Sequence, residues 1–166
     1  MTMTLIQTVT VSGSSTFNVQ FANIPLTFTD LLLVASARSS ATGTSVDTVG
    51  YLINTNSPVF RELYGTGSNS ASWSSSGYLS AFQIPSASHT ANTFGNGSMY
   101  IPNYATAGTK AISIDHVGEN NGTQSRSEIR AASVTATAGI NQIDITIVAG
   151  NYVAGSSFSL YGITRA

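Results

Sequence analysis

The sequence predicts an all-β fold, an antiparallel β-sandwich of the jelly-roll type with about nine or ten strands. Three observations support this prediction. Apolar and polar residues alternate with a period of two in many short segments. β-branched residues dominate these segments, and apolar residues do not recur at helical spacing over a useful length. Glycine, asparagine and proline stand between the segments, where turns are expected.

The first half of the chain shows this alternation most clearly in residues 17–21. Phe17, Val19 and Phe21 alternate with polar residues there, which is typical of a half-buried strand. The segment 28–37 is more continuously apolar, so we expect a central strand that is covered on both faces. The strands expected in this half lie near residues 5–11, 17–21, 28–37, 46–54 and 59–64.

The second half contains a polar, low-complexity stretch and then further alternating segments. Residues 65–77, GTGSNSASWSSSG, read as a loop. In the segment 110–117, Ile112, Ile114 and His116 share one face, and Asp115 lies on the other. We see no domain boundary, and we expect residues 1–166 to form a single domain. The strands expected in this half lie near residues 78–84, 98–102, 110–117, 128–137, 140–149 and 158–163.

The composition excludes several classes of protein. Charged residues make up 8% of the 166 residues, against about 25% in a typical domain. The chain has no cysteine, which excludes a disulfide scaffold and a thiolate zinc site. Lys110 is the only lysine and the net charge is −1, so we expect no binding to nucleic acid or to a membrane surface. We also expect no signal peptide and no membrane span.

Catalytic patterns are weak. Asp115 and His116 are neighbours on one strand and should point to opposite faces, and the nucleophile pattern Gly-x-Ser-x-Gly does not occur. The seven acidic residues are scattered and show no glycosidase pair. Residues 119–124, ENNGTQ, resemble a weak calcium loop but lack its alternating acids. We therefore predict no enzymatic activity, catalytic residue, cofactor or metal; a hydrolase using His116 with a serine stays a third hypothesis.

Aromatic and amide side chains in polar segments are the candidate binding residues. Tryptophan or tyrosine beside asparagine can stack on a sugar ring or contact a protein. Packing in the core or at its rim is the competing interpretation for each aromatic ring. The candidate ligand or interface residues are Trp73, Tyr78, Tyr104, Asn120 and Asn121.

Motifs spread over nearly the whole chain carry a resemblance. They are Ile24-Pro25, Thr27–Leu33, Arg38-Ser39, Leu63-Tyr64-Gly65, Asn92–Gly95, Ile101–Tyr104, Glu119–Asn121 and Phe158–Ile163. Together they resemble a group of small all-β virion proteins of tailed bacteriophages. These motifs are structural and carry no catalytic site.

The resemblance implies a protein of the virion surface, assembled in the cytoplasm of a bacterial host. Our first expectation is a capsid decoration or cement protein that acts as a homotrimer bound to the major capsid protein. The alternative is a tail-fibre component, a receptor-binding or carbohydrate-binding module whose partners would be tail proteins and a host-surface glycan. Because the chain has few charges, we expect an apolar contact between subunits that resists salt.

Overall fold

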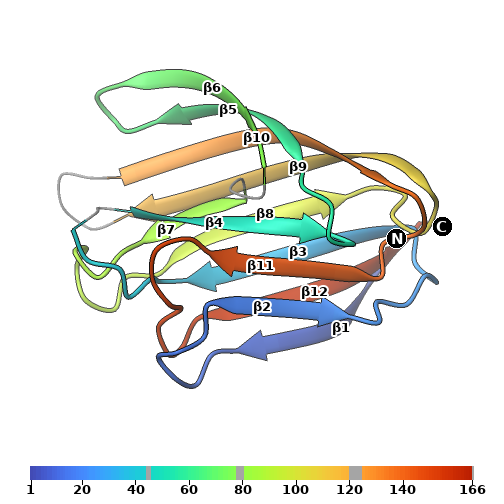
Figure 1. Cartoon of the computed structure of the whole chain (residues 1–166), viewed down its shortest axis with the longest axis horizontal. Helices are drawn as coiled ribbons and strands as arrows, with labels where there is room; N and C mark the ends of the chain where they lie inside the picture. Colours follow the sequence, from blue (N-terminus) through green and yellow to red (C-terminus); the bar gives the residue numbers. More distant parts are fainter. Residues whose placement is uncertain (44–45, 78–80, 120–124, 166) are drawn as a thin grey trace.

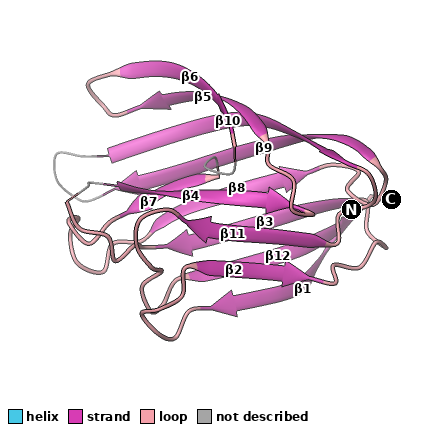
Figure 2. Cartoon of the chain, viewed as in Figure 1, coloured by secondary structure: helices cyan, strands magenta, loops and turns pink. Residues whose placement is uncertain are grey.

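The computed structural model describes residues 1–43, 46–77, 81–119 and 125–165 and shows a β-sandwich (Figures 1 and 2). It has twelve strands in two antiparallel sheets, and no helix occurs in these ranges. The prediction of an all-β sandwich is confirmed, with slightly more strands than expected. The strands are β1 (Thr2–Thr10), β2 (Asn18–Ala22), β3 (Asp30–Ala37), β4 (Val46–Ile53), β5 (Val59–Gly65), β6 (Ser70–Ser76), β7 (Phe82–Pro85), β8 (Gly95–Ile101), β9 (Gly108–Glu119), β10 (Ser125–Ala136), β11 (Gln142–Ile147) and β12 (Ser157–Thr164).

The strand order is that of a jelly roll with two inserted hairpins. The large sheet has the order β1-β12-β3-β8-β9-β10-β5-β6, and the small sheet has the order β2-β11-β4-β7. Without β5–β6 and β9–β10, two four-stranded sheets remain. The chain then passes from one sheet to the other at each successive strand, except between β4 and β7, which pair with each other in the small sheet. The inserted hairpins pair with each other through β5 and β10. They add four strands, β9-β10-β5-β6, to one side of the large sheet, and we call these four strands the extension (Figure 1).

The core lies between the two sheets. Leu33 of β3 and Leu160 of β12 come from the large sheet, and Tyr51 of β4 and Ile145 of β11 come from the small one; all four are fully buried. Strand β3 is central, as predicted, between β12 and β8. The expectation that both its faces are covered is wrong for the single chain, because the outward side chain of Val34 is 41% exposed.

Two local predictions need correction. The stretch 65–77 was expected to be a loop, but β6 forms within it as an edge strand paired with β5. A backbone ladder needs no particular side chain, so a serine-rich segment can supply it. Phe17 precedes β2 and is 60% exposed, whereas Val19 and Phe21 point into the core as expected.

A glycine on β8 lets the small sheet approach the extension. A Cβ atom at Gly97 would lie 2.4 Å from Cδ1 of Phe82 on β7, so only glycine leaves room for this ring. The Phe82 ring then meets the His116 ring of β9 edge-on, with centroids 6.3 Å apart. This contact brings β7 under the inner face of the extension. At the far side of the large sheet the two chain ends meet, since Thr2 pairs with Thr164 (Figure 1).

Candidate functional site

The extension buries several of its charges and exposes several apolar side chains. On β10, Glu128 and Arg130 are 1% and 2% exposed, whereas Ile129 between them is 67% exposed. Antiparallel sheets with one wet face normally place apolar side chains inward and polar ones outward. Residues 126–130 of β10 have the reverse arrangement, so both faces of the extension require an explanation there.

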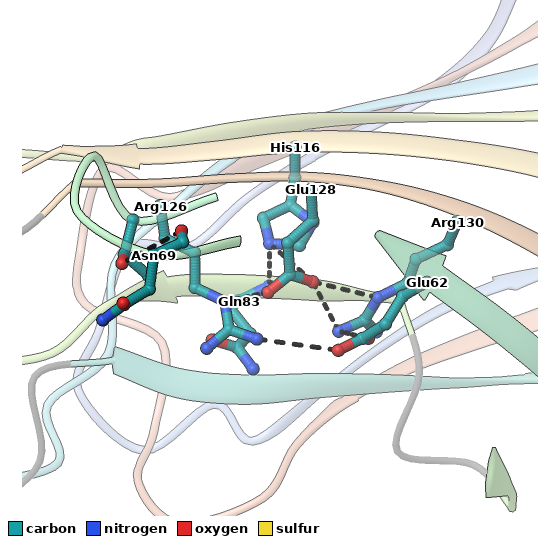
Figure 3. A network of polar contacts seen from close by, with 8 residues as sticks. Glu62, Asn69, Gln83, His116, Arg126, Glu128 and Arg130 are labelled. Atoms are coloured by element: carbon teal, nitrogen blue, oxygen red, sulfur yellow. Dashed lines mark hydrogen bonds and ion pairs between the residues drawn. The ribbon is translucent and has the colours of Figure 1, made fainter. Parts of the chain in front are cut away.

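The inner face carries an ion cluster built from three strands (Figure 3). Glu62 of β5 stands opposite Arg130 of β10 in the strand register. Nη2 of Arg130 lies 2.8 Å from Oε2 of Glu62 and 2.6 Å from Oε2 of Glu128. Arg126 forms an ion pair with Glu128 and lies 3.6 Å from Oε1 of Glu62. One guanidinium therefore bridges two buried carboxylates, and a second guanidinium balances the remaining charge.

The two carboxyl groups respond differently to this environment. Burial raises the pKa of Glu62; the charge of Arg130 opposes this rise, and the charge of Glu128 adds to it. Burial would also raise the pKa of Glu128, but the hydrogen bond and charge of His116 and the charges of Arg130 and Arg126 outweigh it and lower this pKa to about 2. Glu128 is thus held as a carboxylate, and Glu62 is the group that accepts a proton more readily.

His116 joins this cluster to the small sheet. Its Nε2 atom lies 3.3 Å from Oε2 of Glu128 and 3.1 Å from the backbone nitrogen of Gln83 on β7. The side chain is 1% exposed, and Asp115 points to the opposite, exposed face, which confirms the predicted separation of these two neighbours. A substrate would have to displace a strand to reach His116. What the cluster can do is hold β5, β9 and β10 to each other and β9 to β7.

Sequence reasoning missed this cluster. It treated the acidic residues as scattered, but the pairing of β5 with β10 brings Glu62 beside Glu128. A signal was present in residues 126–130, RSEIR, where three charged residues recur at a period of two and so share one face. Such a pattern reads as a solvated face, and only the long-range pairing shows that this face is buried.

The outer face of the extension is exposed and mostly apolar. Leu63 of β5 stands opposite Ile129 of β10, and these two side chains are 64% and 67% exposed. An open groove of about 550 Å³ runs over this face. Val59 and Val117 add side chains that are 47% and 41% exposed. We call this surface the outer patch, defined by Val59, Arg61, Leu63, Asp115, Val117, Ile129 and Ala131.

The residues chosen from the sequence do not form one site. Trp73 is 57% exposed on the edge strand β6, where its ring meets Phe60 edge-on at 5.6 Å. Tyr104 is fully buried and its hydroxyl donates to the carbonyl oxygen of Pro25, so its selection as a surface aromatic is corrected. Tyr78, Asn120 and Asn121 lie outside the described residues.

Comparison with protein-family models, with curated proteins and with solved structures finds no match to this chain. Within the described ranges, no group of three or more histidine, cysteine, aspartate or glutamate side chains is placed to hold a metal ion. The same ranges contain no helix long and apolar enough to cross a membrane.

Proposed function

We propose that this chain is a bacteriophage virion structural protein, a capsid decoration or cement protein that acts without enzymatic activity. The observation that carries the proposal is an almost uncharged exterior on which apolar side chains of the outer patch are exposed. Large exposed apolar surfaces on soluble proteins mark contacts with other proteins. The jelly-roll topology and the motifs that resemble phage virion proteins support the same role.

The exterior carries few charges because the fold uses most of its charged residues inside. Arg38 is 6% exposed and donates to the carbonyl oxygens of His89, Thr90 and Thr93. Lys110 is 3% exposed and donates to the backbone of a neighbouring turn. The remaining buried charges are Asp30, Asp47, Glu62, Glu128, Arg130 and Asp144. A surface of this kind favours burial against protein over attraction to charged ligands.

The proposed role is mechanical. A stable protein contact buries about 1,600 Å² in total, and several such contacts per subunit would fasten neighbouring capsid proteins together. We propose a homotrimer, since a three-fold assembly matches three-fold positions on a capsid. Such a role requires no catalytic site and no cofactor.

The test is the number of copies of this chain per particle, measured by quantitative mass spectrometry of purified virions from the source that encodes it. A decoration protein should be present in hundreds of copies, in a fixed ratio to the major capsid protein. Absence from the particle would overturn the proposal. A few tens of copies or fewer would instead indicate a tail component.

A tail-fibre module that binds a host-surface glycan is the second candidate. The observation in its favour is Trp73, whose half-exposed ring lies on the edge strand β6, on the same face of the extension as Phe60. A glycan-binding screen would support it if saturable binding disappeared in Trp73→Ala. The matched control is Phe17→Ala, because Phe17 is 60% exposed and lies beside the small sheet, away from the groove.

A further inference from the structure

The exposed charges of this chain are concentrated on the outer patch. Among the side chains that the structure describes, the exposed ionised groups are Arg61, Asp115 and Arg165. Arg165 is engaged with Asp30, at 2.8 Å between Nε and Oδ2. Arg61 and Asp115 take part in no ion pair with any other described side chain. The two unpaired charges therefore lie on one apolar face and have opposite signs.

The two charges flank the same strand in the register of the extension. Asp115 on β9 stands beside Ile129 on β10, and Arg61 on β5 stands beside Ala131 on the same strand. The acid and the base thus flank β10 on opposite sides, with Ile129 and Ala131 between them. A two-fold axis that lies in the plane of the contact, crosses β10 between these two residues and runs at right angles to the line from Asp115 to Arg61 places the acid of each copy over the base of the other.

We propose that the outer patch forms a two-fold contact with a second copy of this chain, in which Arg61 of each copy pairs with Asp115 of the other. A two-fold contact uses the same patch on both subunits, so the patch must be complementary to itself. The apolar centre of the patch, Ile129 and Leu63, then packs against its own copy. This proposal rests on the assembly role proposed above and names the surface that serves it. The contact can link neighbouring trimers, because a three-fold and a two-fold contact together form a continuous layer.

The hydrogen bonds of the two charged groups fit this arrangement. Nη1 of Arg61 donates to the carbonyl oxygen of Phe60 at 2.9 Å, and Oδ1 of Asp115 accepts from Ser98 at 2.5 Å. Each contact uses one end of the charged group and orients it on the face of the sheet. These two bonds use Nη1 of Arg61 and Oδ1 of Asp115. The other two atoms, Nη2 of Arg61 and Oδ2 of Asp115, are therefore the ones that form the proposed ion pair between copies.

The test is a charge exchange followed by sedimentation velocity. Arg61→Asp gives a copy with two acids on its patch, and Asp115→Arg gives a copy with two bases. In each single variant, positions 61 and 115 carry charges of the same sign, and these positions meet twice in a two-fold contact. The repulsion should raise the dissociation constant of this contact roughly a hundredfold. An equimolar mixture of the two variants should associate one to one, because every pair across the axis is again of opposite sign. The double variant Arg61→Asp/Asp115→Arg should associate like the wild type.

The matched control is Phe17→Asp, which adds an acid at an exposed position near the small sheet and should leave association unchanged. Far-UV circular dichroism and thermal unfolding show whether each variant folds. Folded single variants that associate like the wild type, or a mixture that fails to associate, would overturn the proposed contact. The decoration role is tested separately, by the copy number of the chain in the virion, which does not depend on the outcome of these association experiments. Single variants that sediment as trimers would support the contact as a link between trimers.

Discussion

At the scale of single residues, Glu128 couples the stability of the fold to pH. Its pKa is about 2 in the folded protein, against 4.5 for an exposed glutamate. A lowered pKa gives stability that is present above the unfolded value and is lost as the pH falls from about 4.5 towards 2. The contribution at neutral pH amounts to about 3 kcal/mol at most. The raised pKa of Glu62 acts in the opposite direction, so its contribution is lost as the pH rises.

We therefore predict that Glu128→Gln makes the free energy of unfolding depend less on pH in the acidic range. The free energy of unfolding in urea should fall less between pH 5 and pH 2.5 in this variant than in the wild type, although the variant is less stable at pH 7. Ser127→Ala is the control, because Ser127 is exposed beside Glu128 on β10 and does not titrate, so it should leave the slope unchanged. An equal slope in Glu128→Gln and the wild type would contradict the assignment.

Single residues were predictable only where local alternation decides their environment. Successive side chains of a strand point to opposite faces, so Asp115 and His116 were expected to do so. The structure confirms this, with Asp115 exposed and His116 buried. The burial of Tyr104 does not follow from its neighbours. Its hydroxyl reaches Pro25, which is far away in the sequence, and such a contact exists only after the sheets have assembled.

At the scale of strands, the ion pair between Glu62 and Arg130 joins the two inserted hairpins. Removing one partner of a buried ion pair costs about 3–5 kcal/mol, because the other partner keeps an uncompensated charge. Replacing both partners by apolar residues of similar volume is often close to neutral. We predict that Arg130→Met destabilises the protein severely, and that Glu62→Leu added to it restores part of the loss.

Urea unfolding of both single variants and of the double variant measures this coupling energy. Arg61→Met, measured at a protein concentration at which the chain is monomeric, is the matched control, because Arg61 is adjacent to Glu62 on β5 but points to the exposed face. It should change the free energy of unfolding by less than about 0.5 kcal/mol. A double variant whose loss equals the sum of the two single losses would show that the two side chains do not interact.

The strands themselves were largely predictable, with instructive exceptions. Segments with alternating side chains, such as 110–117, were found because one buried face imposes a period of two. Strand β6 was missed because its side chains are nearly all exposed and serine-rich, so no face distinguishes it from a loop. In residues 126–130 of β10 the alternation was visible, but the buried face there is the charged one, and hydrophobicity alone assigns such a segment the wrong way round.

At the scale of the whole molecule, the strand order determines which residues meet. The sandwich class followed from short strands and frequent turns. The insertion of β5–β6 and β9–β10 did not, because the pairing of β5 with β10 joins segments that are far apart in the sequence. The ion cluster and the outer patch are two faces of these same strands. Both depend on a pairing that no local pattern specifies, which is why neither was anticipated.

The scarcity of exposed charge predicts how the assembled protein responds to salt. Exposed ion pairs are worth about 0–1 kcal/mol each and are screened by salt, whereas apolar burial is not weakened by it. The proposed two-fold contact has two such pairs around an apolar centre, so its dissociation constant should change by less than about tenfold between 0.1 M and 1 M NaCl. Sedimentation velocity over a dilution series at both salt concentrations measures this change. Dissociation of the oligomer in 1 M NaCl would mean that charges hold it together, and the apolar contact through Ile129 and Leu63 would then be wrong.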